Sequence, residues 1–577
     1  MLPPSQYTCT QTTKSFPSTK KNIALLAAAL WLAAPIHTSA VTYIVQRMAQ
    51  FAALFSVSAI FFYLRLRLTG TGTKKILFFI CFICCALLAL GSKENAALLF
   101  PSIILLEGTF FLQFKKIQTF AQKKRKLFSL LSLILLGLIL VTSWHFIETQ
   151  LPSYGQRTFT MSERLLTEAR LLFLYLSQIF YPTASSLSIA HDIPLSTSLF
   201  TPWQTLPALT GCIGLLVFAT VHVHKRPLLS FAILYYALNH LVESTILSLE
   251  LIFEHRNLLP SLFLFLPLAA FAVDKINEKK WVAITVTIAS TAFLVQSGLA
   301  TVERNRAWKN AGTLNEDAVK KAPLNARAKL NLAGWYTDQK KYQEALALCE
   351  EAEKLSGSEA SLNTIVPIAR NQKGTIAYEL DQPEKAAEYF QQAYSLRKDY
   401  TAAAEKLIAV LIELKRYDEA LKIIAERYSQ KKEPKLLLLK ASIFLRQKKP
   451  NQALASYRQA ELFYQDMPLV TTGLGKALSM LGKHNEAALL LSKAVQQNDP
   501  MSMLLHIENN LLSGQDNEAY IHLKKLIEKI PLVRLLKDLS AAEKDSFQVP
   551  LDQTVLRRAI LHTASLMLSS SQKEDKL

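Results

Sequence analysis

The first 93 residues contain no aspartate and no glutamate, and the first acidic side chain is Glu94. Only six cysteines occur among 577 residues, and three of them share one apolar run near residue 83. Two of these have C-x-x-C spacing, but no second pair follows, so neither a metal site nor a disulfide framework is predicted. The net charge is +20. The second half nevertheless lacks a basic stripe interleaved with aromatics, which argues against a nucleic-acid partner.

Long apolar runs are concentrated in the first half of a chain in which 50% of residues are hydrophobic. Each run has roughly 15–22 residues, close to the ~20 that cross a bilayer. They begin near Asn22, Ala49, Ile76, Ala96, Leu127, Trp203, Leu228, Leu258 and Trp281. We therefore expect an all-α chain with a polytopic helical membrane domain of about nine spans. The lipid bilayer is then one of its binding partners.

Basic loops predict the topology of this domain. Lysine and arginine gather near residues 20, 70, 120, 225 and 278, and the positive-inside rule makes these loops cytoplasmic. Residues 171–181 are apolar but too short to span, so they indicate a re-entrant or interfacial helix. The N-terminus is then cytoplasmic and the chain after residue 300 lies outside, with a bacterial inner membrane and a periplasmic C-terminal half favoured over a eukaryotic lumen.

The second half repeats with a period of about 34 residues, typical of helix–turn–helix tetratricopeptide units. The small residue that opens the second helix recurs at Ala345, Ala386, Ala420, Ala453, Ala487 and Ala519. Such units stack into an α-solenoid with a groove that binds extended peptides. We therefore predict a polar tail (1–21), the membrane domain (22–301), a linker helix (302–325), about six repeats (326–533), and C-terminal helices with a polar tail (534–577).

The densest group of chemically active side chains is Glu254-His255-Arg256, between two apolar runs. Ionised groups beside a bilayer core are costly and often functional. Arg256 could hold a phosphate through paired hydrogen bonds, Glu254 could act as acid or base or orient Arg256, and His255 offers a second donor. The alternative is an interfacial loop whose charges lie among lipid headgroups.

Four local motifs resemble a known family, and they occur in its order. They are the segment 35–47, which ends at Arg47; Ser92-Lys93-Glu94; the segment 188–192, which ends at His191-Asp192; and Glu254-x-Arg256-x-x-x-Pro260-Ser261. Together with the repeats, they resemble the transmembrane-and-tetratricopeptide O-mannosyltransferases and their bacterial relatives, membrane glycosyltransferases of the GT-C fold. The resemblance extends from about residue 22 onward.

This resemblance implies transfer of a sugar from a polyprenyl-phosphate donor to a protein hydroxyl outside the cytoplasm. Donor binding is then assigned to Arg256, Glu254, His255, Lys93, Arg47 and His191. The acceptor is a protein or peptide segment in the repeat groove. No cofactor is implied, and dependence on a divalent metal stays open.

One feature departs from the family, whose catalytic base is an acidic residue in the first extracytoplasmic loop. No carboxylate precedes Glu94, so we expect that loop to be missing, through a misplaced start or a truncated, inactive product. Otherwise the base is Glu94, Asp192 or Glu254. Two other classes stay open: a membrane-anchored repeat adaptor in envelope assembly, and a polymerase or ligase for lipid-linked polysaccharide.

Overall fold

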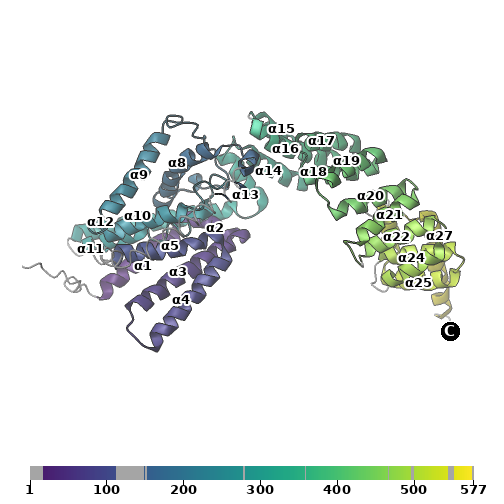
Figure 1. The fold of residues 1–577 in the computed structure, drawn as a ribbon, viewed down its shortest axis with the longest axis horizontal. Coiled ribbons are helices and arrows are strands. Elements are labelled where there is room, and N and C mark those ends of the chain that lie inside the picture. Colours follow the sequence, from purple (N-terminus) through teal and green to yellow (C-terminus); the bar gives the residue numbers. More distant parts are fainter. Residues whose placement is uncertain are drawn as a thin grey trace, which may run out of the picture. The chain divides into compact units, whose positions relative to one another are not determined.

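The computed structural model describes residues 17–111, 152–276, 280–357, 359–465, 467–495, 500–542 and 551–574, together with 144, 148 and 149. Over these residues the protein is helical and has no strand, which confirms the all-α prediction (Figure 1). The chain forms two compact units, Met1–Val366 and Pro367–Leu577. The division falls inside one helix of the repeat region, α16 (Glu359–Glu379).

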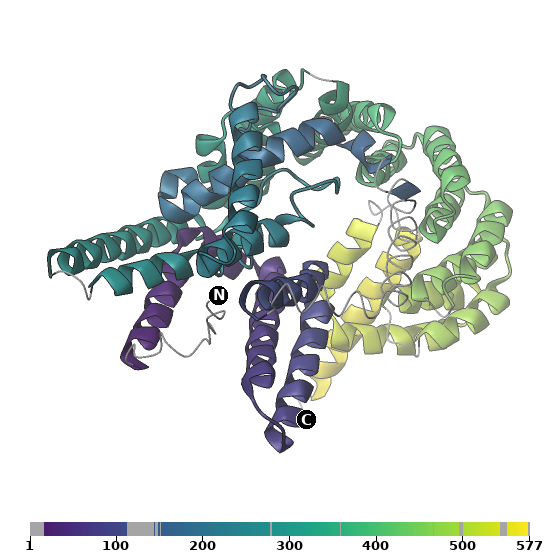
Figure 2. The ribbon, with the colours of Figure 1, turned by 60° about the vertical axis from the view of Figure 1, so that its left-hand side comes forward.

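Three helices in the described part of the first unit are long and apolar enough to cross a membrane. They are α3 (Arg47–Leu68) with the turn before it, α4 (Thr73–Ser92) and α12 (Lys280–Ala307). A bent pair, α1 (Pro17–Ala33) followed by segment Pro35–Thr42, adds a fourth if it forms one broken span. Helices α3 and α4 lie side by side as a hairpin (Figures 1 and 2).

Other predicted spans correspond to shorter helices. These are α5 (Leu99–Phe110), α9 (Thr205–Val221), α10 (Pro227–His240) and α11 (Phe265–Ile276). The apolar run that starts near Leu127 lies outside the described residues. The structure therefore has a few helices of membrane type, and a domain with nine spans stays a prediction.

Helix α8 (Met161–Phe180) is longer than the predicted interfacial segment 171–181. Thr160 begins it with a capping box, in which its hydroxyl accepts from the Glu163 amide (3.3 Å) and the Glu163 carboxylate accepts from the Thr160 amide (2.8 Å). Its first half carries charged side chains that a search for apolar runs cannot recognise as helix. The helix ends one residue before Tyr181, which precedes a proline.

Short elements connect these helices. They are α2 (Thr38–Thr42) and the 3₁₀ turns Pro35–His37, Ile44–Gln46, Glu94–Leu98, Pro152–Gln156, Ala184–Ser186 and Glu254–Asn257. After α12 follow α13 (Ala311–Lys321), α14 (Ala326–Asp338) and α15 (Tyr342–Lys354). An apolar core that includes Leu30, Leu171, Tyr175 and Phe265 joins α1, α8 and α11.

Helices α14 and α15 form the first repeat, and five more pairs follow. They are α16 with α17 (Pro383–Leu396), α18 (Thr401–Glu413) with α19 (Tyr417–Gln430), α20 (Pro434–Arg446) with α21 (Pro450–Glu461), α22 (Pro468–Met480) with α23 (His484–Val495), and α24 (Pro500–Leu512) with α25 (Asp516–Lys529). Helices α26 (Leu532–Ala542) and α27 (Gln553–Glu574) close the second unit.

The small residue that recurs once in each repeat is buried where helices pack together. All six alanines at this position are buried, with at most 1% of their surface exposed. Glycines on the first helix of a pair lie against aromatic rings of a neighbouring helix: Gly374 on α16 lies against Phe390 on α17 of the same pair, and Gly473 on α22 lies against Tyr457 on α21 of the preceding pair. A repeat therefore depends on small residues at the points where two helices approach closely.

The turn between the two helices of every repeat contains one residue with left-handed backbone. In the first four repeats this residue has a side chain, with φ of 61° or 57°, and in the last two it is glycine: Lys340, Asp381, Lys415, Lys448, Gly482 and Gly514. Left-handed backbone ends many helices, and glycine adopts it without steric cost. The first four turns therefore carry a strain that the last two avoid.

Replacing Lys448 by glycine is expected to stabilise the second unit. An L-residue pays about 1 kcal/mol for left-handed backbone, and the greater freedom of glycine in the unfolded chain removes part of that gain. We expect a net gain of about 0.5 kcal/mol, measured as a shift in the unfolding midpoint. The neighbouring Lys449→Gly change, at φ −109°, should destabilise slightly, and equal effects at both positions would contradict this account.

Candidate functional site: a pocket lined by the first repeat

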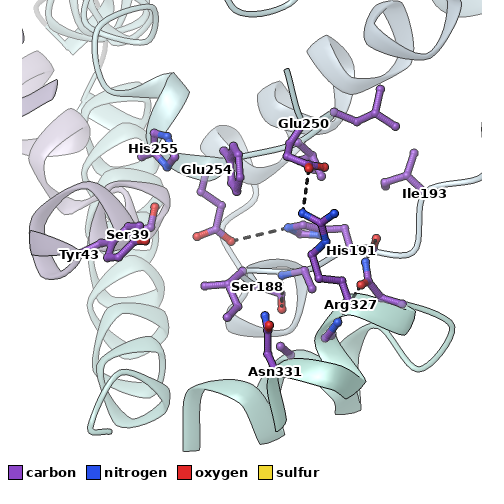
Figure 3. A pocket seen from close by; sticks show the side chains of 18 of the residues that line it. Ser39, Tyr43, Ser188, His191, Ile193, Glu250, Glu254, His255, Arg327 and Asn331 are labelled. Carbon is purple, nitrogen blue, oxygen red and sulfur yellow. Dashed lines mark hydrogen bonds and ion pairs between the residues drawn. The ribbon is translucent and has the colours of Figure 1, made fainter. Parts of the chain in front are cut away.

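The first unit contains a cavity of about 890 Å³ (Figure 3). Its wall is built from four regions of loop and 3₁₀ turn, near residues 43–46, 158–159, 188–195 and 250–255, and from residues of α2, α13 and the repeat helix α14. The polar lining includes Ser39, Tyr43, Gln46, Ser188, His191, Glu250, Glu254, His255, Arg327 and Asn331. The ring centroids of Tyr43 and Trp308 lie 6.0 Å apart. The cavity therefore lies where the start of α3 and the end of α12, two helices of membrane length, come together.

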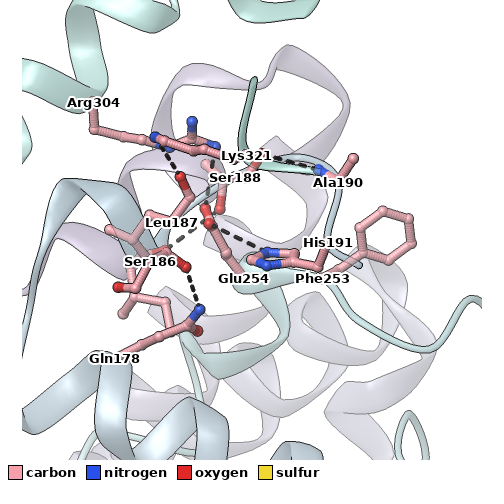
Figure 4. A network of polar contacts seen from close by, with 12 residues as sticks. Gln178, Ser186, Leu187, Ser188, Ala190, His191, Phe253, Glu254, Arg304 and Lys321 are labelled. Atoms are coloured by element: carbon pink, nitrogen blue, oxygen red, sulfur yellow. Dashed lines mark hydrogen bonds and ion pairs between the residues drawn. The ribbon is translucent and has the colours of Figure 1, made fainter. Parts of the chain in front are cut away.

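Glu254 is the central acidic group of this pocket. Its side chain is almost fully buried, and its Oε1 atom has no hydrogen-bond partner. His191 Nε2, which also lacks a hydrogen-bond partner, lies 3.9 Å from Oε1, and Arg304 Nη2 lies 3.5 Å from Oε2 (Figure 4). Two unsatisfied polar atoms thus face each other at a cavity wall, where a ligand could complete their hydrogen bonds.

A buried ion network holds Glu254 from behind. Arg304 is 1% exposed and also contacts Asp317 Oδ2, at 2.9 Å from Nη1. Asp317 pairs with Lys321 at 2.7 Å, and Lys321 Nζ donates to the carbonyls of Ala184 and Leu187. The network therefore links the end of α12, helix α13 and the loop that carries His191.

Burial raises the pKa of Glu254 to about 7, and Arg304 opposes this rise by favouring the ionised form. Burial lowers the pKa of His191 to about 4 and that of His255 to about 3. Near neutral pH the pocket therefore contains uncharged imidazoles and a carboxyl group that can both hold and release a proton. A carboxyl with such a pKa suits acid–base chemistry.

Glu254→Gln is expected to change how stability depends on pH. The pKa of Glu254 is about 7 in the folded protein and near 4.5 in the unfolded chain. Between pH 4.5 and 7 the folded state therefore retains a proton that the unfolded state has lost. The stabilisation from Glu254 is complete below about pH 4.5 and is lost as the pH rises to 7. Relative to the variant, the wild type should lose up to about 3 kcal/mol across this window. Thermal unfolding midpoints from pH 4.5 to 7.5 test this, and parallel curves would contradict it.

Glu250 connects the pocket rim to the first repeat. Its carboxylate lies 2.6 Å from Arg157 and 3.1 Å from Arg327, which is on α14. Two further contacts fix the start of α14: Asp192 Oδ2 accepts from the Leu324 amide (2.8 Å), and Asn325 donates to the His191 carbonyl (3.4 Å). The first repeat is thus a fixed wall of the pocket.

Arg164, on α8, organises the loop that carries Glu250. Its guanidinium is fully buried and pairs with Glu168 at 2.9 Å. It donates hydrogen bonds to four backbone carbonyls of that loop: Glu243 (2.8 Å), Thr245 (2.9 Å), Leu249 (2.5 Å) and Glu250 (3.3 Å). A loop without helix or strand hydrogen bonds needs such partners for its backbone.

The predicted donor-binding residues do not all meet at the pocket. His191, Glu254 and His255 line it, and the ring of His255 stacks on Phe253. Asp192 is adjacent, with its carboxylate directed to the α14 backbone. The sequence analysis took His191 and Asp192 from one motif and Glu254 and His255 from another, and the fold brings the two motifs together.

Arg256 and Lys93 belong to a second cluster, which forms around Glu243. Lys93 Nζ lies 2.6 Å and Arg256 Nε 3.7 Å from the Glu243 carboxylate. Arg256 also donates to the Leu251 carbonyl (3.1 Å) and is 6% exposed. Its guanidinium lies beside the Glu243 carboxylate and is not part of the pocket lining, so its role as a phosphate clamp stays a prediction.

Arg47 and Glu94 are exposed and are not among the pocket-lining residues. The sequence reasoning did not single out Arg164, Arg304 and Arg327, which bind the acidic groups or the backbone around the pocket. An arginine within an amphipathic or apolar helix was the available signal, because such a charge needs a partner. Among the described residues no three histidine, cysteine or acidic side chains are arranged to hold a metal ion.

Comparison with known proteins agrees with the repeat assignment. Residues 324–399 and 371–432 match two tetratricopeptide-repeat family models, which confirms that the chain contains tetratricopeptide repeats. No curated protein matches the chain.

Several solved repeat proteins resemble part of the chain. PilF of Pseudomonas aeruginosa is 18% identical over 36% of this chain and 92% of its own, with a TM-score of 0.29. A tetratricopeptide repeat protein from Parabacteroides merdae is 16% identical over 48% and 95%, with a TM-score of 0.32. YrrB, described as having an unusual peptide-binding site, is 17% identical over 38% and 92%, with a TM-score of 0.23.

Proposed function

We propose that this protein is a membrane-attached tetratricopeptide-repeat adaptor that holds an extended polypeptide segment outside the cytoplasm of a bacterial cell. The observation that carries the proposal is that α14 belongs to the repeat array and also lines the pocket. A segment bound against this first repeat can therefore extend into the cavity, where Asn331 and Arg327 offer hydrogen bonds to a backbone. Three helices of membrane length support attachment to the inner membrane.

Photo-cross-linking tests the adaptor function in the full-length protein. A benzophenone amino acid at Asn331, on the pocket side of α14, is expected to label one defined polypeptide segment. The same group at Glu350, exposed on α15 and outside the pocket lining, serves as the control. Equal labelling at both positions, or labelling of unrelated segments, would contradict the proposal.

A second candidate function is glycosyl transfer from a polyprenyl-phosphate sugar to a hydroxyl of the bound segment. One observation favours it over a plain adaptor: the Glu254 carboxyl, whose Oε1 atom lacks a hydrogen-bond partner and whose pKa is about 7, lies beside the uncharged His191 ring at the cavity wall. A carboxylate in this setting could take the proton of an acceptor hydroxyl. The cavity also adjoins the ends of α3 and α12, which a donor anchored in the bilayer could reach.

This activity is tested with the full chain in lipid nanodiscs, a polyprenyl-phosphate sugar and serine-containing peptides. Transfer that falls at least a hundredfold in Glu254→Gln, and is retained in Glu303→Gln, would support it. Glu303 is an exposed carboxylate one residue from Arg304 and makes a matched control. Absence of transfer in the wild type, with polypeptide cross-linking intact, would leave the adaptor function alone.

A further inference from the structure

One turn of the first unit presents large apolar side chains to its surroundings. Phe200 is 72% exposed, Trp203 is 71% exposed, and Leu199 beside them is 40% exposed. The pocket chemistry does not use these three residues. Such a concentration of exposed apolar surface marks an interaction site when it occurs on a fixed piece of structure.

The backbone of this turn is held by its own hydrogen bonds. The Ser198 hydroxyl accepts from the amides of Phe200 (3.2 Å) and Thr201 (3.1 Å), and the Thr201 carbonyl accepts from the amide of Thr197 (3.0 Å). The turn is thus held by hydrogen bonds among its own residues. The aromatic side chains are presented on a defined framework and do not need to unfold to reach a partner.

The turn belongs to an uncharged stretch that continues into α9. Residues 193–221 contain no acidic or basic side chain, and histidine is also absent. On α9 the exposed large side chains are aliphatic: Ile213, Leu215, Leu216, Val217 and Val221. Thr210 and Thr220 are also exposed, and their hydroxyls donate to backbone carbonyls of the same helix. The far end of the helix is basic, with His222, His224, Lys225 and Arg226. Aromatic residues at one end and cations at the other follow the pattern of helices in membranes.

We propose that Leu199, Phe200 and Trp203 insert into the headgroup region of a lipid bilayer, at the end of α9 remote from its basic residues. The inference rests on the membrane attachment in the proposed function and specifies the surface involved. A bilayer fits better than a protein partner because the surface continues along an apolar helix and offers no charge for recognition. Tryptophan in particular prefers this depth, since its ring is apolar and its N–H can bond to headgroups.

This assignment also places the pocket next to the membrane surface. Ile193 and Leu195, in the same uncharged stretch, line the cavity. Ser196 follows them and is fixed by the Thr205 hydroxyl (2.9 Å) and by the Thr167 hydroxyl, which accepts from its amide (2.9 Å). A bilayer surface at Trp203 therefore adjoins the wall of the pocket.

Tryptophan quenching in nanodiscs measures this insertion in the full-length protein. Lipids brominated either near the headgroup or at the chain end quench indoles at matching depths, and the contribution of one indole is the difference between wild type and a Trp→Phe variant. We expect the emission that is lost in Trp203→Phe to be quenched at least twofold more by headgroup-proximal bromine. Trp335→Phe, in the first repeat, should report an indole that neither lipid quenches.

The same quenching measurement on Trp281, at the start of α12, tests membrane attachment independently of the insertion of Leu199, Phe200 and Trp203, which together are called the anchor here. If the Trp281 emission is quenched while that of Trp203 is not, the anchor is wrong and membrane attachment stands. If neither is quenched, the membrane attachment is wrong as well. Stronger quenching of Trp203 by chain-end bromine would place it in the bilayer core and would also overturn the headgroup assignment.

Discussion

Arg164→Met is expected to destabilise the first unit by about 3–5 kcal/mol, because it removes the partner of a buried carboxylate and of four backbone carbonyls. Glu168 would remain buried without its ion-pair partner, and the loop that ends in Glu250 would lose its support. Hydrogen exchange should show the amides of residues 243–250 exchanging at least tenfold faster. Thermal unfolding in detergent gives the accompanying shift in midpoint.

Two variants separate this mechanism from a general loss of charge. Arg170→Met, on the same helix, removes only hydrogen bonds to Pro194 and Ser196, so a loss of about 1 kcal/mol is expected. Arg164→Met combined with Glu168→Leu removes both members of the ion pair and should recover part of the stability. Equal effects of Arg164→Met and Arg170→Met would contradict the special role of Arg164.

Gly473→Ala is expected to destabilise the repeat array by about 3 kcal/mol, at the upper end of the range for overpacked cores. A Cβ atom at this position would collide with the Tyr457 ring, which is itself buried. The ring cannot move away without opening the neighbouring repeat. Denaturant unfolding of the full-length protein, followed by the helical signal, gives the midpoint that checks this.

The control separates collision from the general effect of replacing glycine. Gly357→Ala adds a methyl group where no atom lies within 4 Å, so a change within about 0.5 kcal/mol is expected. The double variant Gly473→Ala with Tyr457→Leu should be more stable than Gly473→Ala alone, because the smaller side chain leaves room. If the second change adds its own full cost, collision is not the cause.

The repeat array could be predicted well from the sequence because its information is local. A small residue about every 34 positions marks where two helices cross, and from Ala345 to Ala519 the intervals are 41, 34, 33, 34 and 32 residues. The left-handed turn could not be predicted. Lys448 and Lys415 occupy it without the glycine that usually signals such backbone.

The first unit was harder to predict because apolar runs do not specify where helices end. The run beginning near Leu258 is interrupted by turns before α11 starts at Phe265. Charged residues inside helices were equally misleading, since the polar half of α8 contains Arg164 and Glu168. Their burial is favourable only once both partners are in place, which a single-segment pattern does not reveal.

Some residues that line the candidate pocket could be named from the sequence. Glu254, His255 and His191 were selected for their chemistry, and they do line one cavity. Arg256 was selected from the same triplet, but adjacent residues in a 3₁₀ turn point in different directions, and its side chain lies against Glu243. Contacts over long sequence distances, such as Arg304 with Glu254, need the fold itself.

Helix α14 has a consequence for how the protein can be rearranged by engineering or by gene fusion. This helix forms part of the pocket wall and is held there by Arg327 and Asn325. Only the repeats that follow α15 can therefore be replaced without changing the pocket. Repeats added or deleted beyond α15 would change the reach of the array and leave the cavity intact. A chimera joined before α14 would instead replace part of the pocket wall, so a working swap must keep the first repeat together with the helices that precede it.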